Sequence, residues 1–315
     1  MDFPIQDLMD ENACYQYLLA VLHPEGLRCP RCRAREGCQV HRYYREPVLD
    51  YRCPACGRVF NAWTGTGFQG THYRPSVLVL IVRGFARGES TAQLARELRC
   101  SRKNLHTIRH QFQVQAQSAL DRTPLSDTEV EADEMYQNAG EKGIPHLDPD
   151  DPPRRRANQR RGHGTKENDR PPVVGVVGRH TGQVRLEVVE HADQTTLEAI
   201  VERTTTPGVT VYTDEWSGYD HLPELNRNHS TVCHTPGQRE WARDDDGDGI
   251  REVHNNTMEG IWTGVRNFLR VFRGVSKHYL DRYMGIFEWG YNIKEVTEEF
   301  LRALLRTKVV TNLAT

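Results

Sequence analysis

Two Cys-Pro-x-Cys pairs constrain the fold of this chain more than any other feature. "CPRC" (Cys29–Cys32) and "CPAC" (Cys53–Cys56) are separated by twenty residues, and "YYREPVLDYRC" between them alternates like a short hairpin. Each pair places two thiolates on one tight turn, and two such turns complete a tetrahedral zinc site. We therefore predict a zinc ribbon with one structural zinc ion, held by Cys29, Cys32, Cys53 and Cys56. Cys38 lies in the same window and could compete as a ligand, although it has no CxxC partner.

The net charge of −2 hides a strong asymmetry along the 315 residues. Between positions 28 and 113 there are sixteen Lys and Arg residues against five Asp and Glu residues. Such a basic region attracts a polyanion, although it could also be an ordinary solvated surface. The sequence has no apolar run of about 18 residues, which argues against a membrane span. The N-terminus is acidic and unlike a signal peptide, so we expect a cytoplasmic protein with reduced thiols.

Three helices are predicted after the ribbon, within "RPSVLVLIVRGFARGESTAQLARELRCSRKNLHTIRHQFQ" (residues 74–113). Pro75 suits the first turn of one helix, Ser90 or Thr91 caps the second, and Ser101 caps the third. The second and third helices, joined by a short turn, resemble a helix-turn-helix. The third would then present Arg102, Lys103, Asn104 and His106 to a DNA groove. A helical linker without DNA contacts is the alternative.

The character of the chain changes after Pro124, where a mixed sheet with flanking helices is predicted. "TEVEADEMY" (residues 128–136) is typical of a strand, with Glu129, Glu131 and Asp133 on one face and Val130, Ala132 and Glu134 on the other. Three carboxylates along one face are suited to a divalent cation. Residues 171–190 predict a hairpin, and residues 193–204 predict an amphipathic helix.

A second acid ends the next predicted strand, in "VYTDEWSGY". Chemistry in such sheets gathers at the carboxyl ends of the strands, and Asp214 lies at such an end. Glu215 is expected to begin the following turn. The intervening residues 140–170 are rich in Pro, Gly and charge and predict an exposed polar insertion.

The third acid begins a helix predicted from about Thr257 to Phe272. Glu259 and Arg266 are seven residues apart and therefore point nearly the same way. An exposed ion pair would account for these two alone. Together, however, Asp133, Asp214 and Glu259 on separate elements could hold two magnesium ions that support phosphodiester chemistry. The chain has no Gly-rich phosphate loop, so nucleotide hydrolysis is not expected.

The order of these motifs resembles an insertion-sequence transposase with an N-terminal zinc ribbon and a ribonuclease-H-like domain, the class related to Merlin transposases. The resemblance lies in the two cysteine blocks, "EADEMY", "VYTDEWSGY" and "HNNTMEGIWTGVRNFLRVFRGVSKHYLDRYMGIFEWGYN". It implies a DDE triad of Asp133, Asp214 and Glu259 that binds two Mg²⁺ or Mn²⁺ ions. It also implies strand cleavage at element ends and transfer of the 3′-hydroxyl into target DNA. Arg266 occupies a position that is often Lys in the family, so its phosphate contact could differ.

The resemblance also implies the partners, which are double-stranded DNA, as terminal inverted repeats and target, and a second copy of the chain on that DNA. It further implies a cytoplasmic, nucleoid-associated prokaryotic protein. The predicted domains are residues 1–70 with the ribbon, 71–120 with the helix-turn-helix, and 121–303 with the sheet, followed by a tail at 304–315. A non-catalytic DNA-binding regulator and a structure-specific nuclease are the alternative functions. "DDDGDGIREVHN" (residues 244–255) is similar to a calcium loop, but its twelfth position is Asn255, so we expect an acidic loop.

Overall fold

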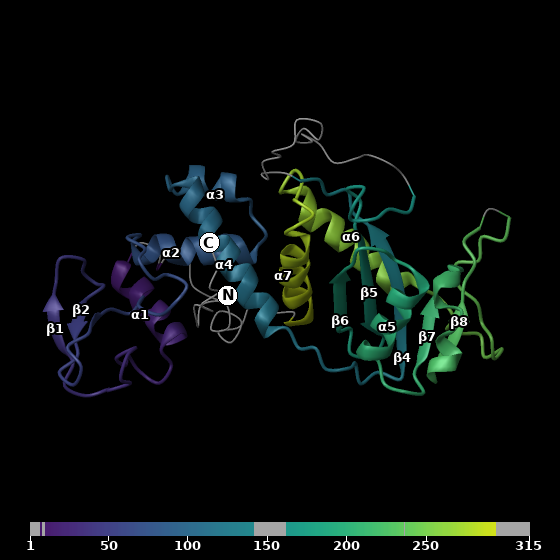
Figure 1. Cartoon of the computed structure of the whole chain (residues 1–315), viewed down its shortest axis with the longest axis horizontal. Helices are drawn as coiled ribbons and strands as arrows, with labels where there is room; N and C mark the ends of the chain where they lie inside the picture. Colours follow the sequence, from purple (N-terminus) through teal and green to yellow (C-terminus); the bar gives the residue numbers. More distant parts are fainter. Residues whose placement is uncertain (1–6, 8–9, 142–161, 236, 294–315) are drawn as a thin grey trace. The chain divides into compact units, whose positions relative to one another are not determined.

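A computed structural model describes residues 7, 10–141, 162–235 and 237–293, which form two compact units. Among these residues, the first unit comprises those up to Ala119 together with Ile293, and the second is Leu120–Asn292 (Figure 1). Most of the predicted insertion, the tail at 304–315 and the last part of the predicted sheet domain lie outside the described residues.

The first unit combines a small three-stranded sheet with four helices. Its strands are antiparallel in the order β1-β2-β3. Its elements are α1 (Glu11–Leu22), β1 (Gln39–Arg42), β2 (Asp50–Arg52), β3 (Val59–Phe60), α2 (Pro75–Ala86), α3 (Thr91–Glu97) and α4 (Arg102–Ala119). Edge-to-face aromatic contacts link its pieces, since Trp63 packs on Tyr15 and Phe68, and Phe112 packs on Phe68 and Phe85.

The predicted helix starts in this unit are confirmed. Pro75 is the first residue of α2, where its missing N–H costs no hydrogen bond. Ser90 caps α3 by accepting the Gln93 N–H, and α4 begins directly after Ser101.

The second unit is built on a five-stranded mixed sheet in the order β6-β5-β4-β7-β8. Strands β4, β5 and β6 are antiparallel neighbours, whereas β7 lies parallel to β4 and β8 lies parallel to β7. The elements are β4 (Glu129–Tyr136), β5 (Pro172–Gly178), β6 (Val184–Val188), α5 (Gln194–Thr204), β7 (Thr210–Thr213), the 3-10 turns η2 (Ser217–Tyr219) and η3 (Leu222–Leu225), β8 (Asn228–Thr231), α6 (Asn256–Arg270) and α7 (Leu280–Ile293). The predicted α/β class, a ribonuclease-H-like mixed sheet with flanking helices, is confirmed.

Helices cover both faces of this sheet, which explains why every residue of β5 is buried (Figure 1). One apolar cluster joins β5 and β6 to α6 and α7 through Val173, Leu186 and Trp262. The other joins β4, β5 and β7 to α5 and the two 3-10 turns, with Leu197 and Tyr219 at its centre.

Gly175, at the middle of β5, lets α6 approach the sheet closely. A methyl group built at this position would lie 2.4 Å from Cε of Met258 and 2.8 Å from the ring of Trp262. Since real Cβ atoms do not come that close to their neighbours, any larger residue would force α6 outward.

None of the described helices is both long enough and apolar enough to cross a membrane.

Candidate active site

Asp133 lies in the middle of β4 and faces α6. Its Oδ2 accepts the indole N–H of Trp262 at 2.8 Å, and its Oδ1 accepts the backbone N–H of Glu134 at 2.8 Å. Burial, assisted by the charges of Glu134 and Asp214, raises the pKa of Asp133 to about 8. The charged form of Asp133 is therefore disfavoured by its surroundings, and a bound cation would offset this cost.

Asp214 follows the last residue of β7, on the strand beside Asp133. The pairing of β4 with β7 ends at Glu131 and Tyr212, two residues before each acid. Asp214 Oδ1 accepts the backbone N–H of Trp216 at 3.0 Å. Burial raises its pKa, while that N–H opposes the shift. The first two predicted acids are therefore electrostatic neighbours just beyond the point where the parallel pairing of β4 and β7 ends, and in sheets of this kind ligands bind beyond the carboxyl ends of parallel strands.

Glu259 lies in the first turn of α6 and is exposed, as is Arg266. It is one helical turn from Trp262, the residue that contacts Asp133, so both face the same side of the helix. Among the described residues, the three predicted acids do not form a group whose ligand oxygens all lie within 4.8 Å of one another. Two ions can be held by carboxylates that are spaced more widely than this.

Glu131 has a structural task, which corrects the prediction that three acids along one face of β4 serve a cation. It is fully buried, and its Oε2 accepts the backbone N–H groups of Thr257 and Met258 at 2.8 and 3.0 Å. Its Oε1 pairs with Arg179 Nε at 3.0 Å. A carboxylate at a helix N-terminus satisfies donors that lack partners within the helix. Glu131 therefore fastens the start of α6 to β4, and Glu129 instead accepts the hydroxyl of Tyr212 at 2.8 Å.

Glu134 is a further acid at the site that the sequence-based reasoning did not select. It points to the opposite face from Asp133, as the alternation predicts, and its Oε2 accepts the hydroxyl of Tyr219 at 3.0 Å. Burial, with a contribution from Asp214, raises its pKa to about 7. Its place directly after Asp133 was the only signal in the sequence.

Aromatic side chains line the same region. His163 Nδ1 lies 2.7 Å from the hydroxyl of Tyr136, and the His163 ring lies 4.5 Å from that of Trp216, measured between centroids. Trp216 also supplies the backbone N–H that holds Asp214, so these rings border the two acids.

Glu215 turns away from this cluster. Its carboxylate accepts the backbone N–H of His234 and the hydroxyl of Thr235, which fastens the segment after β8. It therefore stabilises a loop.

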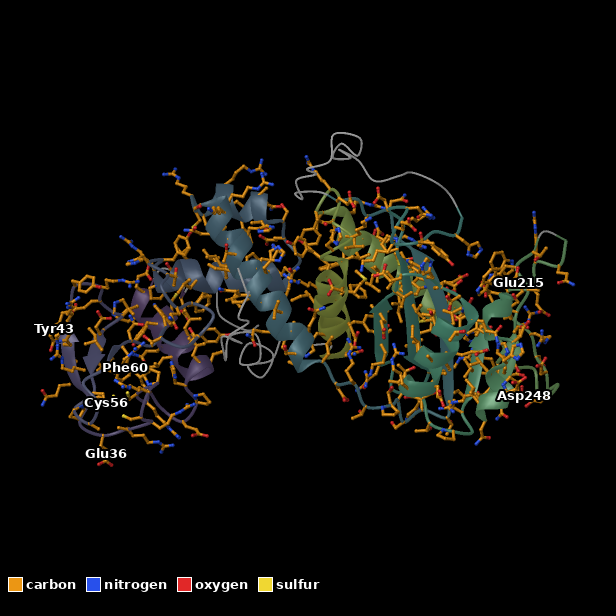
Figure 2. All side chains as sticks on the ribbon, viewed as in Figure 1. Glu36, Tyr43, Cys56, Phe60, Glu215 and Asp248 are labelled. Carbon is orange, nitrogen blue, oxygen red and sulfur yellow. The ribbon has the colours of Figure 1, made fainter. Side chains whose placement is uncertain are left out.

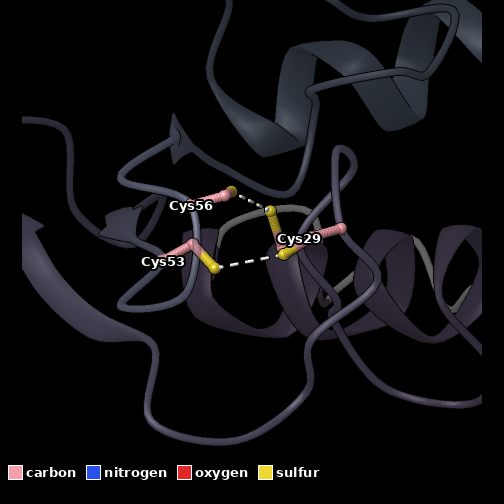
Figure 3. A group of neighbouring side chains, drawn as sticks. Cys29, Cys53 and Cys56 are labelled. Carbon is pink, nitrogen blue, oxygen red and sulfur yellow. Dashed lines mark hydrogen bonds between the residues drawn. The ribbon is translucent and has the colours of Figure 1, made fainter.

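The four predicted zinc ligands come together in the first unit. One sulfur atom each from Cys29, Cys32, Cys53 and Cys56 lies within 4.8 Å of the other three (Figure 3). The Cys29–Cys56 and Cys32–Cys53 pairs are both 3.5 Å apart. Four sulfur atoms about 2.3 Å from one zinc ion would have similar separations, so the donor set fits structural zinc. Cys38 is not part of this group.

The residues predicted to contact DNA occupy the first turn of α4. Arg102, Lys103, Asn104 and His106 are exposed, whereas Leu105 and Ile108 face the core. Arg109, on the same helix, is buried and donates to the hydroxyl of Thr91, the first residue of α3. This bond holds the two helices of the predicted helix-turn-helix together.

The acidic loop before α6 holds a second group of possible metal ligands, from Asp244, Asp246 and Glu252. The oxygens of Asp244 already accept the N–H groups of Gly247 and Gly249 within the loop. Asp248 of this loop is exposed (Figure 2), and the Asn255 side chain donates to the backbone oxygen of Ala132.

Comparison with known families identifies the second unit. A model of the ISXO2-like transposase domain matches residues 124–292. The chain belongs to this transposase family. A Halobacterium salinarum protein described as an uncharacterized protein in transposable element ISH50 is 30% identical over 309 residues, covering 96% of this chain and 99% of that protein. An uncharacterized transposase-like protein of Haemophilus influenzae is 25% identical over 127 residues, covering 39% of this transposase and 94% of that protein.

Solved structures give weaker similarity. The Mos1 transposase paired-end complex with left transposon end has a TM-score of 0.27 and 13% identity, covering 71% of this transposase and 76% of that chain. A simian T-cell lymphotropic virus intasome in complex with PP2A regulatory subunit B56 gamma has a TM-score of 0.30 and 10% identity, with 66% of each chain covered. The family assignment therefore rests on the sequence matches, and the predicted resemblance to insertion-sequence transposases is confirmed.

Proposed function

We propose that this transposase cleaves DNA strands at the ends of its element and joins the freed 3′-hydroxyl to target DNA, with Asp133, Asp214 and Glu259 as catalytic residues. The observation that supports it most is the pairing of Asp133 with Asp214. They lie two residues beyond the last parallel pair of β4 and β7, the charge of Asp214 helps to raise the pKa of Asp133, and Asp133 contacts the helix that carries Glu259 in its first turn.

The donor set of this cluster fits hard divalent cations. Carboxylate oxygens are the ligands that Mg²⁺ and Mn²⁺ prefer. Burial raises the pKa values of Asp133 and Asp214, and a bound cation would offset the cost of their charges. The three acids would hold two ions, which when bound would supply activation of the attacking oxygen and stabilisation of the leaving one. Trp262 and Trp216 orient the first two carboxylates by donating to them.

DNA recognition is assigned to the first unit and to α6. The zinc held by the four cysteines would fix the ribbon, while Arg102, Lys103, Asn104 and His106 would contact the inverted repeats. Arg266 is exposed two turns from Glu259, where its guanidinium could bind a phosphate of the cleaved strand. Binding of two ends would place two copies of the chain on the DNA.

Cleavage of labelled DNA tests this proposal. The purified transposase is incubated with duplexes that carry the inverted repeats that flank its gene, with and without Mg²⁺. We expect nicking and strand-transfer products from wild type and none from Asp214→Asn. The exposed Asp220, six residues further along the chain, provides a matched control as Asp220→Asn. Equal cleavage by wild type and Asp214→Asn would refute the assignment, and nicking without strand transfer would favour a nuclease.

A further inference from the structure

The main chain does not fix the distance between Asp133 and Asp214. Strand β4 remains paired with β5 as far as Tyr136, and β7 remains paired with β8 as far as Thr213. The pairing between β4 and β7 ends earlier, at Glu131 and Tyr212. β4 and β7 are therefore not paired with each other where the two acids lie, so side-chain contacts there contribute to the separation of Asp133 and Asp214.

Glu134 makes a direct hydrogen bond between β4 and the turn that follows Asp214, beside the ring contacts of Tyr136, His163 and Trp216. The hydroxyl of Tyr219 donates to Glu134 Oε2 at 3.0 Å. Tyr219 is fully buried and belongs to the same apolar cluster as Leu197 and Leu222. A buried hydroxyl needs a hydrogen-bond partner, so this contact fixes the turn η2 relative to β4.

The same turn holds Asp214. The Tyr219 N–H donates to the backbone oxygen of Trp216 at 3.3 Å, and the Trp216 N–H donates to Asp214 Oδ1 at 3.0 Å. Three hydrogen bonds therefore connect Glu134 to the carboxylate of Asp214, and Glu134 adjoins Asp133 in the chain. A displacement of Tyr219 would move Asp214 relative to Asp133.

We propose that Glu134 is a positioning residue, which sets the separation of Asp133 and Asp214 by holding Tyr219 across the unpaired ends of β4 and β7. This role rests on the proposed function, because it concerns the two acids that would bind divalent ions. It requires the hydrogen-bond acceptor of Glu134 and not its charge.

A second contact of the same chemistry provides the control. Tyr212 on β7 donates its hydroxyl to Glu129 on β4 at 2.8 Å. This hydrogen bond joins β4 and β7 where their backbones are already paired. Its removal should therefore leave the separation of Asp133 and Asp214 unchanged. Tyr219→Phe and Tyr212→Phe thus delete equivalent hydroxyl groups on the two sides of the point where pairing ends.

Mn²⁺ binding to the full chain without DNA is the direct test, with free Mn²⁺ followed by electron paramagnetic resonance. Loss of a group that orients a ligand typically weakens metal binding about 10–100-fold, so we expect at least roughly tenfold weaker binding in Tyr219→Phe and Glu134→Ala. The double variant should bind no worse than either single one, because both break one link. Glu134→Gln keeps an acceptor and should remain within about threefold of wild type, as should Tyr212→Phe.

Three results would overturn the positioning role: unchanged binding in Tyr219→Phe, equal losses in Tyr219→Phe and Tyr212→Phe, or a loss in Glu134→Gln as large as in Glu134→Ala. The last would mean that the charge of Glu134 acts directly. Asp214→Asn separates these results from failure of the proposed function. If it binds Mn²⁺ as wild type does, the metal site and the positioning role both fall. If it loses binding while Tyr219→Phe does not, only the positioning role falls.

Discussion

Replacement of Glu131 should destabilise the second unit far more than replacement of Asp133, although the two acids are neighbours on one face of β4. Glu131→Ala removes the buried partner of the largely buried Arg179 and leaves the Thr257 and Met258 N–H groups without their acceptor. Breaking a buried ion pair from one side costs about 3–5 kcal/mol. Because 1 kcal/mol corresponds to about 2–4 °C in a unit of this size, Tm should fall by roughly 6–20 °C.

Differential scanning calorimetry in metal-free buffer measures this effect. Glu129→Ala is the matched control, since Glu129 is an exposed acid on the same strand whose contact with Tyr212 lies near the surface, and it should change Tm by no more than about 4 °C. Asp133→Asn should melt close to wild type yet abolish Mg²⁺-dependent cleavage. A Glu131→Ala variant that melts within about 2 °C of wild type and fails to bind Mg²⁺ would refute the division of labour between these two acids.

Further outcomes concern pH, zinc and DNA. Because the pKa values of Asp133 and Glu134 are raised to about 8 and 7, the folded protein keeps protons that the unfolded chain has lost. These two groups should therefore lower the free energy of unfolding of the metal-free protein as pH rises from about 4 to 8, by at most about 1.4 kcal/mol per pH unit for each group. Thermal melts across this range measure the trend, and Asp133→Asn should make it less steep. Cys53→Ser should lose bound zinc while Cys100→Ser retains it, as measured by elemental analysis; retention of zinc by Cys53→Ser would contradict the ligand set. Lys103→Ala should weaken duplex binding at all sequences and reduce the slope of log affinity against log salt by about 1, as measured by fluorescence anisotropy, and an unchanged slope would show that Lys103 does not contact phosphate.

Short-range patterns predicted much of this structure. The four cysteines of the predicted zinc site lie within two CxxC turns, so spacing alone predicts that they come together. The helix starts at Pro75 and Ser90 follow from the chemistry of single residues. Alternation and turn residues predicted the hairpin of β5 and β6 and the strand that precedes Asp214. Together these elements predicted a mixed sheet.

Long-range partners could not be predicted in the same way. Alternation placed Glu131 and Asp133 on one face, and only the fold shows that Glu131 meets the start of α6, 126 residues further along the chain. The role of Glu134 depends on where β4 and β7 stop pairing, and no local pattern records that point. Asp133 was preferred through family resemblance, and its role remains a prediction.

The missing side chain at Gly175 has a consequence for how this site could be altered. The strand β5 contains no acid, yet it sets how deeply the indole of Trp262 descends toward Asp133. A single methyl group at this position would push α6 away from the sheet and would displace Glu259 with the helix. It would do so without contacting any of the three predicted acids. Substitutions that inactivate this transposase could therefore occur on β5, a strand that contributes no carboxylate to the site.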